Sequence, residues 1–124
     1  MAPPESSVRL LRNARDDILT AEETFKLHEE RTGVAAYLVS QYIEKSIKSK
    51  LVELDLPYPR THNITALLEL LPDKSLSKRY VWQAVVLTSF AAVPRCDDAL
   101  PTVQSVRDAL VYAKDMAEEI SKIR

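Results

Sequence analysis

Glycine is nearly absent from this sequence, since Gly33 is the only one among 124 residues. A β-rich fold needs glycine at many tight turns, so its scarcity favours long helices with few breaks. Glycine-rich loops that bind phosphate through backbone N–H groups are excluded for the same reason. The length fits one domain, and we expect residues 1–124 to form it.

Cysteine, long apolar runs and net charge are also scarce. Cys96 is the only cysteine, so a disulfide within the chain is excluded, and it shows no metal-ligand spacing with the two histidines. The sequence therefore predicts neither a metal nor a cofactor. It contains no run of about 18 apolar residues and no signal peptide, which predicts a cytoplasmic protein without a membrane segment. The net charge of −1 gives no overall attraction to nucleic acid.

Apolar residues recur at helical spacing in four segments. They predict four long helices, over about residues 8–27, 34–54, 77–93 and 103–120. We expect Ser6 or Ser7 to cap the first helix, Thr102 to cap the last, and Gly33 to break the chain between the first two. A short helix over residues 64–71, capped by Asn63 or Thr61, fits before Pro72. The sequence thus predicts an all-α, up-and-down four-helix bundle with one additional short helix.

Candidate ligand-binding residues gather between residues 34 and 63. They are Glu44, Lys45 and Lys48 on the second helix, and Arg60, His62 and Asn63 after a Pro-Tyr-Pro turn. His62 could act as a general acid or base, because its unperturbed pKa is about 6.5. The alternative is a histidine that only holds the turn. The three charged helix residues fit a ligand site and a surface ion-pair network equally well.

Residues 73–95 form the only positive segment. It holds four basic residues and one acidic residue, namely Lys74, Lys78, Arg79, Arg95 and Asp73. A solvated helix face and a local anion site both fit this excess. Arg95 follows the expected helix, where its forked donors could bind a phosphate or carboxylate. An ion pair with Asp97 or Asp98 is the alternative.

Apolar residues lie nearly all round the helix expected over residues 77–93. This pattern predicts burial on two sides, one against the core and one against a protein partner. Tyr80 and Trp82 are the candidate anchors of that interface, because large aromatic side chains dominate binding energy at protein contacts.

Four sequence pieces, in this order and spacing, resemble the HEPN family over nearly the whole chain. They are A-R-D-D-I-L-T-A (14–21), A-A-Y-L-V-S-Q-Y-I-E-K-S-I-K-S-K-L (35–51), R-T-H-N-I-T-A-L-L (60–68) and P-R-C-D-D (94–98). The resemblance implies a helical bundle that dimerises with a second copy, in which Glu44, Lys45, His62 and Arg95 occupy motif positions.

The same resemblance implies two alternative functions. The first is a non-catalytic binding module that holds a minimal nucleotidyltransferase or its substrate, with a nucleotide as ligand. The second is a metal-independent ribonuclease, the toxin of a toxin–antitoxin pair, built on an R-x(4–6)-H motif. No histidine follows Arg95 at that spacing, and one residue separates Arg60 from His62. The binding module is therefore favoured over the RNA-cleaving enzyme, and His62 and Arg95 stay candidate catalytic residues.

Overall fold

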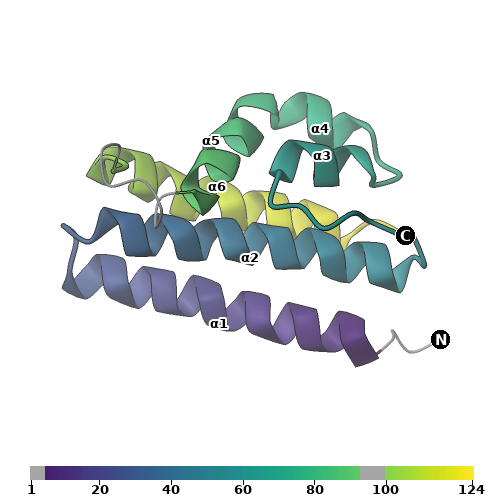
Figure 1. Ribbon diagram of the computed structural model, residues 1–124, viewed down its shortest axis with the longest axis horizontal. Helices are drawn as coiled ribbons and strands as arrows, with labels where there is room; N and C mark the ends of the chain where they lie inside the picture. The colour runs from purple at the N-terminus through teal and green to yellow at the C-terminus, as the bar shows by residue number, and fades with distance from the viewer. Residues whose placement is uncertain (1–4, 93–99) are drawn as a thin grey trace.

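The computed structural model describes residues 5–92 and 100–124. Within these ranges the backbone forms six α-helices and no β-strand (Figure 1). The helices are α1 (Glu5–Leu27), α2 (Thr32–Glu53), α3 (Ile64–Glu69), α4 (Ser75–Arg79), α5 (Val81–Ala91) and α6 (Val103–Ser121). The predicted all-α bundle is confirmed. None of the helices in these ranges is apolar over a length that could cross a membrane.

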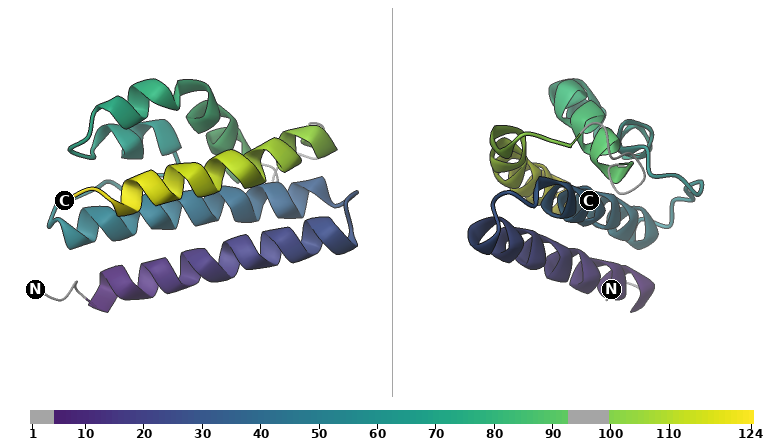
Figure 2. Two further views of the ribbon diagram at one scale, coloured as in Figure 1. Left: turned by 180° about the vertical axis from the view of Figure 1, so that it is seen from behind. Right: turned by 60° about the vertical axis from the view of Figure 1, so that its left-hand side comes forward.

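The central element is α2, which lies between α1 on one side and α3, α5 and α6 on the other (Figures 1 and 2). Its apolar side chains are buried over most of its length, including Val39, Ile43, Ile47 and Leu51. α1 packs mainly against α2, and it runs in the opposite direction to α6. The interior of the bundle is therefore organised around one helix.

Small residues let α1 approach α2 closely. Ala14 and Ala21 of α1 and Ala35 and Ala36 of α2 are completely buried. Because these side chains add little bulk, the two backbones come near each other along the helix pair. The small residues in the first half of α2 thus serve the contact with its neighbours.

A pair of buried serines joins the start of α1 to the end of α2. The Ser7 hydroxyl donates to the carbonyl oxygen of Ser49 at 2.9 Å, and the Ser49 hydroxyl donates to the carbonyl oxygen of Ser7 at 2.8 Å. α1 begins at Glu5, so Ser7 lies inside its first turn. The prediction that Ser6 or Ser7 caps this helix is wrong, because both lie inside it and the Ser7 hydroxyl is used between helices.

The two ends of α2 differ in backbone conformation, and the second end has a residue in the left-handed region. Gly33 lies inside the first turn of α2, and the chain turns at residues 28–31 without positive φ, so the predicted glycine break is wrong. At the other end Asp55 has φ of 57°. The Leu56 N–H donates to the Leu51 carbonyl and the Asp55 N–H to the Val52 carbonyl, which is a Schellman motif with Asp in the usual glycine position.

The helix expected over residues 77–93 is divided in two. Tyr80, with φ −109° and ψ 31°, leaves the helical conformation between α4 and α5. Its hydroxyl donates to the carboxylate of Glu119 on α6, and Arg79 pairs with the same carboxylate. These contacts hold the break against the neighbouring helix. The α4–α5 pair occupies the fourth position of the predicted bundle, and α3 is the additional short helix.

Two predicted caps are confirmed. The Asn63 side chain accepts a hydrogen bond from the Ala66 N–H at 3.0 Å at the start of α3. The Thr102 hydroxyl accepts one from the Ser105 N–H at 3.0 Å at the start of α6. Both short polar side chains satisfy backbone donors that a helix start leaves free.

Candidate functional site

A buried carboxylate organises the candidate site. Glu44 is 6% exposed, and its two carboxylate oxygens have different partners. Oε1 lies 2.7 Å from Nδ1 of His62, and Oε2 lies 3.0 Å from Nζ of Lys48. Lys48 Nζ also lies 5.5 Å from the centre of the Tyr58 ring, within the range of a cation–π contact. We call Glu44, Lys48, Tyr58 and His62 the Glu44 cluster.

Local chain geometry brings His62 back to α2. Glu44 and Lys48 are one helical turn apart, so their side chains share a face. Pro57 and Pro59 keep the chain extended after α2 and carry it back past Lys48. The Ile64 N–H then donates to the Thr88 hydroxyl of α5 at 2.9 Å, which ties the start of α3 to the core. His62 is thereby held between two fixed segments.

The contact with Glu44 uses one of the two imidazole nitrogens. Because a carboxylate only accepts, Nδ1 of His62 donates to Glu44, and Nε2 takes no part in this contact. The His62 side chain is 62% exposed, so a ligand can reach it. The cluster can therefore offer an exposed imidazole beside the Lys48 side chain.

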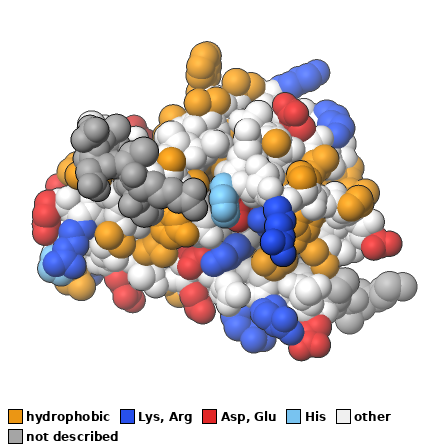
Figure 3. Space-filling view, viewed as in Figure 1, with side chains coloured by type: hydrophobic (Ala, Val, Ile, Leu, Met, Phe, Trp, Pro, Cys, Tyr) orange, Lys and Arg blue, Asp and Glu red, His pale blue; other side chains and the backbone are white. Residues whose placement is uncertain are grey.

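Lys and Arg side chains gather on one face of the molecule. Figure 3 shows Lys and Arg side chains next to a histidine near the middle of the face seen in Figure 1. Arg60 is exposed in the segment between α2 and α3, and within the described ranges it forms no ion pair. An anionic ligand would meet these side chains first.

The other predicted ligand residues have structural partners or lie elsewhere. Lys45 Nζ lies 2.6 Å from the Asp17 carboxylate, and this partly buried pair ties α2 to α1. Asn63 uses its side-chain oxygen to cap α3. Arg95 lies outside the described residues. Of the sequence candidates, the structure thus brings Glu44, Lys48 and His62 together and directs Lys45 and Asn63 to other contacts.

The two predicted interface anchors differ in exposure. Tyr80 is partly buried and hydrogen-bonded to Glu119, and burial together with that contact raises the pKa of its phenol to about 12. Trp82 is 77% exposed, and Val81 and Val85 beside it are exposed as well. We call Val81, Trp82 and Val85 the α5 patch. Tyr80 supports the helix junction, whereas Trp82 is free to contact a partner.

Lys50 is a buried cation that the sequence reading missed. Its Nζ lies 3.0 Å from the Ile123 carbonyl oxygen, 3.3 Å from the Ser121 carbonyl oxygen and 3.2 Å from Glu53. The ammonium therefore satisfies carbonyls at the end of α6. Its position three residues after Ile47, on the apolar stripe of α2, was the available signal. Among the residues that the structure describes, no group of three His, Cys, Asp or Glu side chains could hold a metal ion.

Comparison with known proteins identifies one family. A family model described as the HEPN domain matches residues 7–123. The match covers α2 to α6 completely and α1 from its third residue. No curated protein and no solved structure was found to match the chain.

Proposed function

The chain belongs to the HEPN family, and we propose that it is a non-catalytic binding module that holds a minimal nucleotidyltransferase or its substrate. The observation that carries this proposal is the exposed α5 patch. α5 buries Ala84, Leu87 and Phe90 in the core, yet Trp82 and its neighbours on the outer side are apolar too. Such a helix has two apolar sides, and only one of them is covered by the described residues, 5–92 and 100–124.

Trp82 supports a protein contact for energetic reasons. A side chain of this size that leaves water on binding contributes more than most residues of an interface. Lys78, near the end of α4, is exposed as well. The partner proposed for the patch is a nucleotidyltransferase, and a second copy of this chain, which would form the homodimer, is the competing occupant.

The Glu44 cluster supports a nucleotide as the ligand. Lys48 and Arg60 supply positive charge, and the exposed His62 side chain shares the Glu44 carboxylate with Lys48. Phosphate groups bind such cations, and the Tyr58 ring offers an apolar surface nearby. The proposed module would thus hold its partner through the α5 patch. It would hold a nucleotide through the Glu44 cluster and Arg60, which lies in the segment before α3.

A pull-down from the native host tests the partner. Tagged wild-type protein, Trp82→Ala and Leu19→Ala would be used as baits, followed by mass spectrometry. Leu19 is an exposed apolar residue on α1 and serves as the matched control. We expect a nucleotidyltransferase in stoichiometric amount with the wild type and Leu19→Ala, and its loss with Trp82→Ala. Recovery of the bait alone would contradict the proposal.

A metal-independent ribonuclease is the second candidate function. The observation in its favour is the 2.7 Å contact between Glu44 and Nδ1 of His62, because a carboxylate behind an imidazole orients it as a general base. Cleavage of a labelled RNA in the presence of EDTA tests it. Activity that is lost in His62→Ala would favour the enzyme, and no cleavage by purified wild type would favour the binding module.

A further inference from the structure

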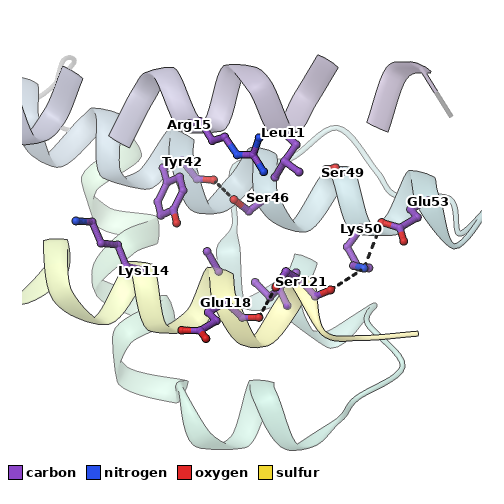
Figure 4. Close-up of a pocket in the computed structure, with 12 residues that line it drawn as sticks. Leu11, Arg15, Tyr42, Ser46, Ser49, Lys50, Glu53, Lys114, Glu118 and Ser121 are labelled. Carbon is purple, nitrogen blue, oxygen red and sulfur yellow. Dashed lines mark hydrogen bonds and ion pairs between the residues drawn. The ribbon is translucent and has the colours of Figure 1, made fainter. Parts of the chain in front are cut away.

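A groove separates part of α1 from α6. Ion pairs close one end, where Lys114 of α6 meets Glu22 of α1 and Arg107 of α6 meets Glu29 in the turn after α1. Beyond these pairs, toward the start of α1 and the end of α6, the surface is hollowed to about 340 Å³ (Figure 4). This volume is at the lower end of the roughly 300–1,000 Å³ that small-molecule sites occupy.

The groove is separate from the Glu44 cluster. Its floor is formed by one face of α2, with residues 42, 46, 49, 50 and 53. At about 100° per residue these positions share one side of the helix, and Glu44 and Lys48 lie on the opposite side. The groove therefore belongs neither to the proposed nucleotide site nor to the α5 patch.

The walls combine apolar surface with a small excess of positive charge. Leu11, Ala117 and Ile120 give an apolar surface, and the lining holds three cations against two carboxylates. Two of the cations already have partners: Lys50 contacts Glu53 and carbonyl oxygens of the chain end, and Lys114 pairs with Glu22. Three cations against two carboxylates give an excess of one charge in the lining, and Glu22, which lies outside the lining, offsets it by pairing with Lys114.

Arg15 is the cation that remains for a ligand. Within residues 5–92 and 100–124 its guanidinium forms no ion pair, and Figure 4 shows it on the groove side of α1, above Tyr42. Burial and the Glu22 carboxylate raise the pKa of the Tyr42 phenol, and the Arg15 charge acts against this rise, so its field reaches the hydroxyl. In the same ranges the Tyr42 hydroxyl donates no hydrogen bond. The lining therefore offers two donors, one from α1 and one from α2, beside apolar walls.

We propose that this groove binds a small apolar monocarboxylate. The carboxylate would accept hydrogen bonds from the Arg15 guanidinium and the Tyr42 hydroxyl, and the apolar body would lie against Leu11, Ala117 and Ile120. A guanidinium matches a carboxylate through two parallel N–H donors. A phosphate monoester fits less well, because its second charge would face Glu53 and Glu118 with only one cation free.

Binding of octanoate tests the proposal without reference to any partner or nucleotide. Octanoate would be titrated into the isotope-labelled full chain and followed by the backbone amide signals. We expect saturable shifts at groove residues such as Leu11, Ser46 and Ala117. 1-Octanol, which keeps the apolar body and lacks the charge, should bind at least tenfold more weakly. Inorganic phosphate should leave these signals in place.

Arg15→Gln and Arg12→Gln form the matched pair of variants. Both arginines are exposed on α1, and Arg12 does not line the groove. Octanoate should bind at least tenfold more weakly to Arg15→Gln and unchanged to Arg12→Gln, with unaltered melting temperatures showing that both variants fold. Equal affinity in the two variants, octanoate shifts confined to the α5 patch, or phosphate binding as tight as octanoate would overturn the proposal.

Discussion

His62 and Glu44 are 18 residues apart in sequence, yet Nδ1 of one lies 2.7 Å from Oε1 of the other. The carboxylate is almost completely buried, while the imidazole is mostly in water. The contact ties an exposed histidine to a buried carboxylate on the central helix α2. The same carboxylate also holds Lys48, so its removal affects two partners at once.

Glu44→Gln should destabilise the protein. The amide keeps a hydrogen-bond acceptor but loses the charge that balances Lys48, whose side chain is only 15% exposed. We expect the free energy of unfolding to fall by about 1–3 kcal/mol, since a charge left without its partner is costly in a buried position. Urea denaturation monitored by circular dichroism measures the change.

His62→Ala serves as the comparison for this variant, because the imidazole is exposed and its loss leaves no buried charge. Its effect should stay within about 1 kcal/mol. A larger loss in His62→Ala than in Glu44→Gln would show that the histidine, and not the carboxylate, holds the cluster.

Asp55→Gly should stabilise the protein. Asp55 has φ of 57°, where a side chain is disfavoured and glycine is not. We expect a gain of about 0.5–1 kcal/mol, in spite of the greater freedom that glycine has in the unfolded chain. Asp55→Ala should instead be less stable than the wild type. The order Gly, Asp, Ala in melting temperature is the observable, and any other order contradicts the Schellman geometry.

The serine pair should show a measurable coupling. Ser7 and Ser49 exchange hydrogen bonds between α1 and α2 in a buried position. A double-mutant cycle with Ser7→Ala and Ser49→Ala should give a coupling free energy of about 1 kcal/mol. Ser6→Ala, at an exposed neighbour on α1, is the control and should change stability by less than about 0.5 kcal/mol. Strict additivity of the two single variants would argue against the contact.

Tyr80→Phe should change the response to alkaline pH. The pKa of the Tyr80 phenol rises from 10.0 to about 12, chiefly through burial and then through its hydrogen bond to Glu119. A pKa raised on folding stabilises the protein below the unfolded value, and this contribution is lost as the pH rises through the folded value. Wild-type stability should therefore fall between pH 10 and about 12.

In Tyr80→Phe that fall should be smaller, and stability at neutral pH should be lower by about 1 kcal/mol because the hydrogen bond is lost. Tyr112, whose pKa is also raised to about 12 by burial, remains and should leave part of the slope. Guanidinium denaturation at a series of pH values measures both effects. Identical slopes in wild type and variant would contradict the assigned role of Tyr80.

Local sequence signals predicted the elements whose ends depend on local contacts. Asn63 and Thr102 were correctly identified as caps, because each bonds a backbone N–H three residues away. The break at Tyr80 was not predicted, since no glycine or proline occurs there and the helical spacing of apolar residues continues through it. At the break the Tyr80 hydroxyl contacts Glu119, which lies 39 residues further along the chain, and local spacing cannot show such a contact.

In the candidate site too, sequence spacing predicted some contacts and not others. Glu44 and Lys48 could be paired from their spacing of four residues. The contact of His62 with Glu44 required the path of the chain after α2, and the pairing of Lys45 with Asp17 required the rotation of α1 about its axis. Neither can be read from one-dimensional spacing. The buried role of Lys50 depends on where the end of α6 lies, 71 residues away.

The central place of α2 also orders the ways in which the molecule can open. α1 packs mainly against α2, so it can separate while the contacts of α2 with α5 and α6 persist. α2 cannot separate by itself, because exposing it requires the loss of its contacts with α1, α3, α5 and α6. Amide hydrogens of α1 should therefore exchange with solvent through a partial opening, and those of α2 only when the whole chain unfolds. Because α1 and α2 both line the groove, a ligand bound there would slow the exchange of the α1 amide hydrogens in particular.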